Sequence, residues 1–257
     1  MISAVIAVLT VFSLSVRFSH SGIDVFQGKR TISVRFHGED VPEPVLLESG
    51  GLALFYPVTY RIEVFSPDGT LLVGKKLVKG YYELESYSAF DADEEKVAVA
   101  YRYGGKTHLK IVYFNGRTEE RTFDDFFPAG LWIRKGKTIL RLYGVKNNHV
   151  TDDFIVIGKR EIKIPGVIAV DLLKGNFIYA TKYEVLYEGR RIPLKEPILD
   201  MRVNKGRVYL LLGDGTVGIL ENGKVYGIGK VEHPFPRLFV IRDRLLVLTE
   251  EGESHEF

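Results

Sequence analysis

The sequence contains no cysteine among its 257 residues. This absence excludes a disulfide framework, a thiolate nucleophile and a metal site with cysteine ligands. Thermolabile side chains in general are scarce, with two methionines and a single glutamine, Gln27. Because Lys, Arg and Glu are abundant beside them, the composition favours a thermophilic, archaeal-like source.

The sequence also has little net charge. Its 35 basic and 33 acidic residues leave a formal charge of +2, and the basic residues are scattered along the chain. Proteins that bind nucleic acid or an anionic membrane usually carry a clustered positive patch. We therefore expect neither nucleic acid nor a membrane surface among the partners, unless the N-terminal segment is an anchor.

A long apolar run occurs at the start, where residues 1–16 read MISAVIAVLTVFSLSV. This segment lacks the basic n-region of a signal peptide, and it is shorter than the roughly 20 residues of a membrane-spanning helix. Its many Val, Ile and Thr residues favour strands. We expect residues 1–20 to belong to the first blade of the fold described below, with a signal or anchor as the alternative. The expected location is cytoplasmic, with a secreted or membrane-tethered protein as the alternative.

No stretch of the sequence shows the periodicity of an amphipathic helix. The apolar residues run instead in patches of about four to eight, bounded by Gly, Pro, Asn or Asp. KVAVAYRY (Lys96–Tyr103) and RVYLLL (Arg207–Leu212) are examples. These patterns predict an all-β chain.

Turn signals recur between the strand-like runs. Asn-Gly, Asp-Gly and related pairs supply the positive φ angles that tight hairpins need, and proline marks a strand start because it lacks an N–H for the ladder. These signals fall into three series. The turns of the NG-type series start at Gln27, Ser66, Asn115, Gly158, Glu188 and Asn222, and those of the KG-type series start at Ser49, Arg134, Leu173, Asn204 and Ile241. The prolines of the third series are Pro44, Pro128, Pro165, Pro197 and Pro236.

In order, the signals define a unit of four strands joined by a KG-type turn, a loop and an NG-type turn. Its period is about 31 to 47 residues, close to the roughly 40 of a propeller blade. We predict one domain over residues 1–257, a β-propeller of seven small four-stranded blades with a short last one. Six blades, a pair of β-sandwiches and a β-helix are the alternatives. The seven first strands should begin near Ile2, Val45, Leu84, Ala129, Val167, Ile198 and Arg237.

The segment IEVFSPDGTLL (Ile62–Leu72) and the turn pattern resemble, in a generic way, the WD-repeat and quinoprotein-like propellers. The Gly-His and Trp-Asp marks of WD repeats are absent, and the chain has one tryptophan, Trp132. The resemblance implies an architecture without a particular activity or partner, because one propeller fold hosts many functions.

Motifs for familiar enzyme chemistry are missing. Gly213, Gly215 and Gly218 form a GxGxxG, but the residues after it predict a strand and a hairpin rather than the helix of a dinucleotide site. No GxSxG, HExxH or EF-hand loop occurs. We expect no cofactor, and the sequence gives no indication of catalysis.

The polar stretch YGVKNNHVTDD (Tyr143–Asp153) contains the one local cluster of metal-ligating residue types that we single out. His149, Asp152 and Asp153 could hold a divalent cation or supply an acid and a base. The simpler interpretation is a solvated loop whose Asn and Asp residues satisfy their own turns. We therefore assign no metal site and keep these three as weak candidates.

The histidines and many aromatic residues gather on one predicted rim, formed by the loops between second and third strands and by the links between blades. Aromatic side chains on a rigid scaffold give a large contact area at a low entropy cost. We predict a protein-interaction scaffold that binds a protein or peptide there. The alternative is a small-ligand or carbohydrate-binding protein, or a hydrolase, with its site in the central cavity of that rim. The candidate binding residues are Tyr81, Tyr82, Tyr103, Phe126, Phe127, His149, His233 and Phe235.

Overall fold

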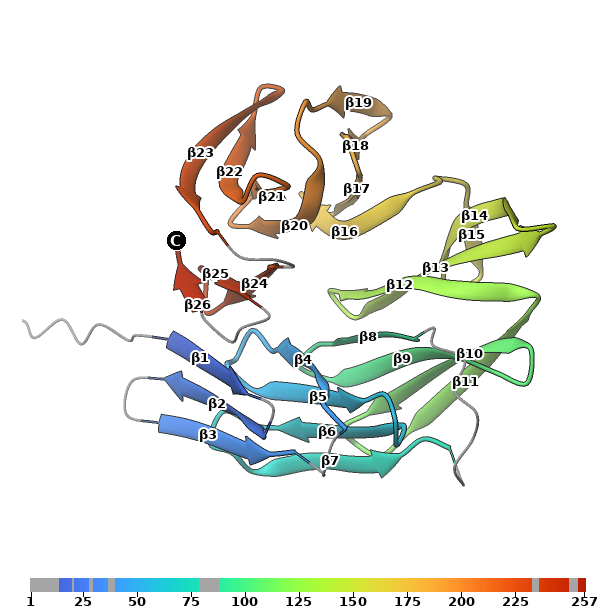
Figure 1. Ribbon diagram of the computed structural model, residues 1–257, viewed down its shortest axis with the longest axis vertical. Helices are drawn as coiled ribbons and strands as arrows, with labels where there is room; N and C mark the ends of the chain where they lie inside the picture. The colour runs from blue at the N-terminus through green and yellow to red at the C-terminus, as the bar shows by residue number, and fades with distance from the viewer. Residues whose placement is uncertain are drawn as a thin grey trace, which may run out of the picture.

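The computed structural model describes residues 14–19, 21–27, 30–36, 40–78, 88–232, 236–249 and 254–257. These residues form seven antiparallel sheets, each with its strands in sequence order, arranged in a ring (Figure 1). We call the sheets blades 1 to 7. In the part of the chain that the structure describes, no helix is long and apolar enough to span a membrane. The cytoplasmic location stays a prediction.

The strands of each blade follow one another without a crossover. Blades 1 to 3 contain β1 (Leu14–Ser19), β2 (Gly22–Gln27) and β3 (Arg30–Arg35); β4 (Glu43–Leu46), β5 (Leu52–Tyr56), β6 (Arg61–Phe65) and β7 (Leu71–Lys76); β8 (Ser88–Ala92), β9 (Lys96–Tyr103), β10 (Lys106–Tyr113) and β11 (Thr118–Asp124). Blades 4 and 5 contain β12 (Phe126–Arg134), β13 (Lys137–Lys146), β14 (His149–Ile157) and β15 (Arg160–Ile162); β16 (Val167–Leu173), β17 (Asn176–Thr181), β18 (Glu184–Tyr187) and β19 (Arg190–Pro193). Blades 6 and 7 contain β20 (Ile198–Asn204), β21 (Arg207–Leu212), β22 (Thr216–Glu221) and β23 (Lys224–Lys230); β24 (Arg237–Ile241), β25 (Arg244–Leu248) and β26 (Ser254–Glu256).

The tight turns have the conformation that their residues predict. Lys135 and Gly136 have φ angles of 47° and 72°, and Asn222 and Gly223 have 50° and 77°. Two successive positive φ angles are the mark of the type I′ turn, whose twist matches that of the strands it joins. The turn pattern in the sequence therefore located the hairpins correctly.

Burial falls from the second strand of a blade to the outermost strand. Every residue of β5 is buried, so this strand reads as the continuous apolar run LALFY. In β11, by contrast, six of the seven residues are exposed and the strand reads TEERTFD. Blades pack face to face, which buries both faces of the inner strands and leaves the outermost strands in solvent.

The two ends of the ring differ in the connections that they carry. One end, which we call the turn rim, holds the 1–2 and 3–4 turns, such as residues 135–136 and 158–159 of blade 4. The other end, the loop rim, holds the 2–3 loops, such as residues 147–148, and the links between blades, such as residues 163–166.

The seven-bladed prediction is confirmed, and the six-bladed alternative is wrong. Blades 1 and 7 each show three strands among the described residues rather than four. The ring closes where β26 contacts β1, and where the backbone N–H of Arg242 in blade 7 donates to the Glu48 carbonyl of blade 2 over 3.0 Å. The predicted first strand near Ile2 and the start near Leu84 lie outside the described residues.

Pro44 and Pro128 differ from the expectation that each such proline is the first residue of its strand or lies in the loop before it, since Pro44 is the second residue of β4. Pro128 departs further. It is the third residue of β12, beside a β-bulge between Pro128 and Gly130. β12 is the innermost strand of blade 4, and only β13 pairs with it. A strand with one free edge tolerates a residue without an N–H, which explains why β12 begins before the predicted Ala129.

The GxGxxG segment forms the loop between β21 and β22 and the start of β22, so a strand and a hairpin follow it, as predicted. Gly215 lies in the β21–β22 loop with a φ of 83° and accepts a hydrogen bond from Val231 N over 2.9 Å. A Cβ at this position would lie 2.1 Å from the carbonyl oxygen of Val231. Gly215 is thus required both by its backbone conformation and by the close approach of another segment.

We expect Gly215→Ala to lower the free energy of unfolding by at least about 2 kcal/mol more than Gly206→Ala. Gly206 has a similar φ of 76° but nothing within 4 Å of its Cβ position, so its substitution carries backbone strain alone, about 1–2 kcal/mol. Urea unfolding of both variants measures the difference. Equal losses would show that the close approach to Val231 does not constrain the loop.

Candidate functional site

Four of the eight predicted binding residues lie in the described part of the chain. Tyr103 ends β9, Phe126 and Phe127 begin β12, and His149 begins β14. All four therefore lie at the loop rim, on the neighbouring blades 3 and 4. The other four, Tyr81, Tyr82, His233 and Phe235, lie outside the described residues.

The aromatic residues at this end mostly contact one another. Phe127 stacks on Tyr143 at 5.4 Å between ring centroids, and the Arg102 guanidinium lies 3.8 Å above the Phe127 ring. Tyr103 contacts the ring of His108 at 6.1 Å and is still 38% exposed. Such contacts fix the rings in place and leave part of each available to a partner.

The weak metal candidates do not form a cation site with one another. Both carboxylate oxygens of Asp153 accept hydrogen bonds from Arg141, over 2.8 and 2.6 Å, and one also accepts from Gly166 N. Asp152 and His149 are exposed. Across the described residues, no group of three His, Asp or Glu side chains is placed to hold a metal ion.

Exposed large apolar side chains concentrate at the loop rim. Of the eleven in the described residues, seven lie in 2–3 loops, in links or at the adjoining strand ends, and none lies in a 1–2 or 3–4 turn. The remaining four lie on the outermost strands β7 and β23. The seven are Val41, Val58, Tyr103, Val145, Val150, Tyr183 and Leu199.

Hydrogen bonds between segments hold these loops. The buried carboxylate of Asp40 accepts from Val58 N, Thr59 N and the Thr59 hydroxyl over 3.1, 2.8 and 2.7 Å. The carbonyl of Phe126 accepts from Arg102 Nη1 over 2.7 Å and from the Thr107 hydroxyl over 2.6 Å. The loop rim is therefore a preorganised surface, which lowers the entropy cost of binding.

The centre of the ring holds a polar cavity of about 520 Å³ near the turn rim. The ends of six innermost strands line it, and three bases and six acids contribute charge. The alternative prediction placed a ligand site at the loop rim, whereas this cavity lies toward the opposite end. Its charged residues are Arg134, Lys135, Arg202, Glu48, Asp91, Asp93, Glu94, Glu95 and Asp171.

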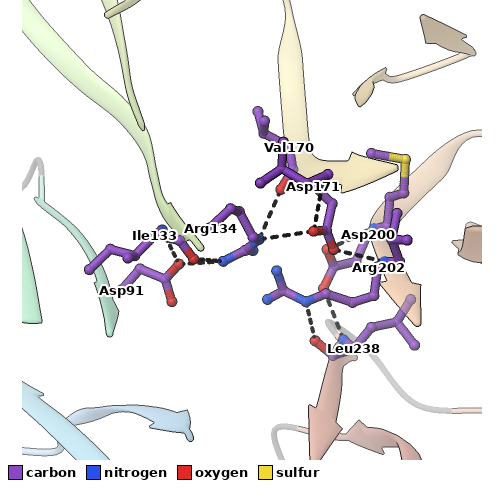
Figure 2. Close-up of polar contacts among 11 residues, drawn as sticks. Asp91, Ile133, Arg134, Val170, Asp171, Asp200, Arg202 and Leu238 are labelled. Carbon is purple, nitrogen blue, oxygen red and sulfur yellow. Dashed lines mark hydrogen bonds and ion pairs between the residues drawn. The ribbon is translucent and has the colours of Figure 1, made fainter. Parts of the chain in front are cut away.

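Carboxylates on the innermost strands join neighbouring blades around this cavity. Asp91 on β8 accepts a hydrogen bond from Ile133 N on β12 over 2.7 Å (Figure 2). Asp171 on β16 accepts from Val203 N on β20 over 2.7 Å, and Asp200 on β20 accepts from Leu238 N on β24 over 2.9 Å (Figure 2). Each carboxylate replaces the strand-to-strand hydrogen bonds that separate sheets cannot make.

Two arginines reach the next blade in the same direction. Arg134 Nε donates to the Val170 carbonyl over 3.0 Å, and Arg202 Nε donates to the Leu238 carbonyl over 2.9 Å (Figure 2). Arg134 Nη1 also pairs with Asp91 at 2.8 Å. With Ser49 N donating to Glu94 over 2.8 Å, and with the Arg242 bond to blade 2, hydrogen bonds link blades 2 to 7 in a closed circuit.

Burial dominates the electrostatics of this circuit. It raises the pKa of Asp200 to about 6, against the hydrogen bonds from Leu238 N and Met201 N, which favour the ionised form. Burial likewise raises the pKa of Asp171, while Arg134 opposes the shift. The Arg134 guanidinium loses hydration on burial, but the charges of Asp91 and Asp171 outweigh this loss and raise its pKa.

The sequence reasoning missed the central cavity and the charged residues that line it. The signal was present, because AFDA, AVDLL and ILDM each place an acid inside an apolar first strand, at Asp91, Asp171 and Asp200. A charge repeated in the innermost strands needs partners across the blade boundary. Loops carry function more often than strands do, which is why the prediction favours residues of the loop rim.

The ring of antiparallel blades around a central cavity defines this protein as a seven-bladed β-propeller. No family model matches the sequence, and no curated protein matches it either. The architecture, and not a sequence family, therefore links this chain to known proteins.

Solved propellers share the fold at low sequence identity. Virginiamycin B lyase from Staphylococcus aureus superimposes with a TM-score of 0.61 at 10% identity, covering 95% of this chain and 93% of that one. BBS1N in complex with ARL6DN gives 0.58 at 11% identity, covering 91% and 83%. BamB from Moraxella catarrhalis gives 0.50 at 10%, covering 96% and 82%. At this identity the likeness extends to the fold alone.

We expect Asp91→Ala to cost about 3–5 kcal/mol in the free energy of unfolding, because it leaves the Ile133 N–H without an acceptor and removes the closer of the two carboxylates paired with the buried Arg134, Asp171 remaining at 3.8 Å. The matched control is Asp124→Ala, which breaks the Lys106–Asp124 pair at the same 2.8 Å but at side chains 53% and 71% exposed. That loss should stay within about 1 kcal/mol. Chemical unfolding at pH 7 compares the two, and similar losses would contradict a stabilising role for the buried pair.

The raised pKa of Asp200 predicts a dependence of stability on pH. The folded protein holds a proton on this group up to about pH 6, whereas the unfolded chain releases it near the ordinary value of 3.8. Protonation of Asp200 therefore stabilises the folded protein fully below pH 3.8, and this stabilisation is lost as the pH rises through 6. It contributes at most about 3 kcal/mol to the free energy of unfolding.

Measuring unfolding free energies of the parent and of Asp200→Asn between pH 4 and 7 tests this dependence. The unfolding free energy of the parent should rise relative to that of Asp200→Asn as the solution is acidified, because the variant cannot take up the proton. A difference that stays constant over this range would show that Asp200 has an ordinary pKa.

Proposed function

We propose that this propeller is a protein-interaction scaffold that binds a protein or peptide partner at its loop rim, over blades 2 to 6. The observation that carries the proposal is the concentration there of seven of the eleven exposed large apolar side chains. Val58, Val150 and Tyr183 are 54%, 62% and 46% exposed. Aromatic and apolar anchors at the centre of a contact supply most of its binding energy.

The chemistry of this surface also favours a protein partner. Its aromatic rings carry polar tips, as at Tyr103 and Tyr183, and its exposed apolar residues are separated by polar loops. A formal net charge of +2 supplies little long-range attraction for nucleic acid. The loop rim thus matches a mixed apolar and polar protein surface better than a polyanion.

One solved propeller supports this kind of partner. BBS1N, which shares the fold, was crystallised in complex with ARL6DN. A propeller of this architecture therefore serves elsewhere as a platform for a second protein, which is the role proposed for this chain.

The triple variant Val58→Glu/Tyr103→Ser/Val150→Glu tests the surface. We expect it to lose at least about 10-fold of the affinity for a partner recovered stoichiometrically by the parent, because it removes apolar contact area and adds buried charge. The matched control is Leu72→Glu/Tyr226→Ser/Ile228→Glu, on the outermost strands, which are exposed to a similar extent. Quantitative pull-down from native extract, followed by titration with the purified partner, gives the measurement.

Melting temperatures of both triple variants that equal that of the parent establish that neither change acts through unfolding. Retention of the partner by the loop-rim variant and its loss from the control would place the contact on the outer strands and contradict the proposal. Recovery of no stoichiometric partner by the parent would also contradict it.

A further inference from the structure

We propose that the central cavity near the turn rim binds a small zwitterion, a free amino acid or dipeptide, with its carboxylate on Arg202 and Arg134 and its ammonium group on Glu48 and Glu94. This site is separate from the loop rim, and it does not depend on the proposed function. Either site can exist without the other, because the two occupy opposite ends of the ring.

Arg202 supplies the first evidence for an anionic group. Its guanidinium lines the cavity and, in Figure 2, projects from β20 toward the centre, where Arg134 also lies. Its Nε donates to the Leu238 carbonyl. Among the described residues, its two terminal nitrogens make no hydrogen bond or ion pair. A guanidinium fork with unused N–H groups facing a cavity matches the two oxygens of a carboxylate.

Arg134 adds a second set of unused donors. Its Nε and Nη1 bind Val170, Ile133 and Asp91, but Nη2 is buried without a hydrogen-bond partner in the structure. A buried N–H group without an acceptor is costly, and native proteins rarely leave one in place. Because Nη2 is closed to solvent, a ligand oxygen bound between the two arginines would satisfy it only after the Arg134 side chain moved toward the cavity that it lines.

The acidic residues at the cavity mouth indicate a cationic group on the same ligand. Glu48 and Glu94 lie on neighbouring 1–2 turns and are exposed. The Glu48 carboxylate makes no ion pair within the described chain. The pKa of this carboxyl is raised by its partial loss of hydration at the cavity mouth and by the charges of Glu94 and Asp171, while the charge of Arg134 opposes the shift. Arg134 and Lys205 pair with Asp171 and Asp243, but no described basic side chain forms an ion pair with Glu48 or Glu94.

The charge balance selects a zwitterion over a simple ion. The cavity is lined by six acids and three bases, so an anion alone would be repelled at the mouth. A cation alone would leave the donors of Arg202 and Arg134 unused. The volume of about 520 Å³ falls in the range of ligand pockets and accommodates an amino acid or a dipeptide. The lining residues sit on the innermost strands and their turns, which keeps the site preorganised.

Calorimetric titration of the full chain at low salt tests this inference. The probes are the free L-amino acids and a set of dipeptides, with succinate as a dianion and spermidine as a polycation. We expect at least one zwitterion to bind, and its N-acetyl and methyl ester derivatives, which each lack one charge, to bind at least about 10-fold more weakly.

Two single variants test separately the side chains proposed to bind the carboxylate and the ammonium group of the ligand. Arg202→Met should weaken zwitterion binding by about 10-fold or more, and Glu48→Gln should weaken it by about 5-fold or more. The same substitutions at exposed positions outside the cavity lining, Arg207→Met and Glu221→Gln, should leave the affinity within about twofold. Because Glu48 is exposed on a turn, its variant keeps the test valid if Arg202→Met unfolds.

Three results would overturn the proposal. They are the absence of binding by any zwitterion at millimolar concentration, binding of succinate or spermidine in preference to every zwitterion, and unchanged affinity of Glu48→Gln. Pull-down results with the loop-rim variants are independent of these titrations, so failure of one proposal is distinguishable from failure of the other.

Discussion

Hydrogen bonds from charged side chains on the innermost strands to the backbone of the next blade hold the ring together. Apolar packing between blades is strong but has no preferred direction, so it leaves the rotation of one sheet against the next weakly specified. Asp91, Asp171 and Asp200 each accept a backbone N–H of another blade. These directional bonds fix blades 3 and 4, 5 and 6, and 6 and 7 against each other, and each carboxylate is tolerated in its apolar strand because it has donors.

The same bonds divide the molecule into two chemically different ends. Charged side chains at the centre and the turn rim either bond to a neighbouring blade or line the cavity, as Arg134 and Arg202 do. The loop rim carries most of the exposed apolar and aromatic side chains of the described residues, such as Tyr103 and Val150, among polar residues on loops held by further hydrogen bonds. A large partner at the loop rim and a small ligand in the central cavity can therefore bind to the same ring without competing for a surface.

Prediction from the sequence succeeded where local rules apply. Glycine turns such as Lys135–Gly136 adopt the predicted positive φ angles, and the first strands beginning at Val167, Ile198 and Arg237 start at the predicted residues. It was less accurate at β12, where Pro128 lies inside the strand, because only the free edge of that strand makes a proline acceptable there. Half of the candidate binding residues are described, and they lie at the expected rim.

The sequence by itself determined the all-β class, the hairpins and the repeat of seven blades, because turn chemistry and the period of apolar residues act over a few neighbouring positions. Only the tertiary structure decided which charged residues meet at the centre. Asp91 and Arg134 are 43 residues apart, and Arg242, whose Nε donates to the Ser49 carbonyl where the ring closes, is 193 residues from it. No local pattern encodes such pairs, since closure of the ring, and not the chain between them, brings their side chains together.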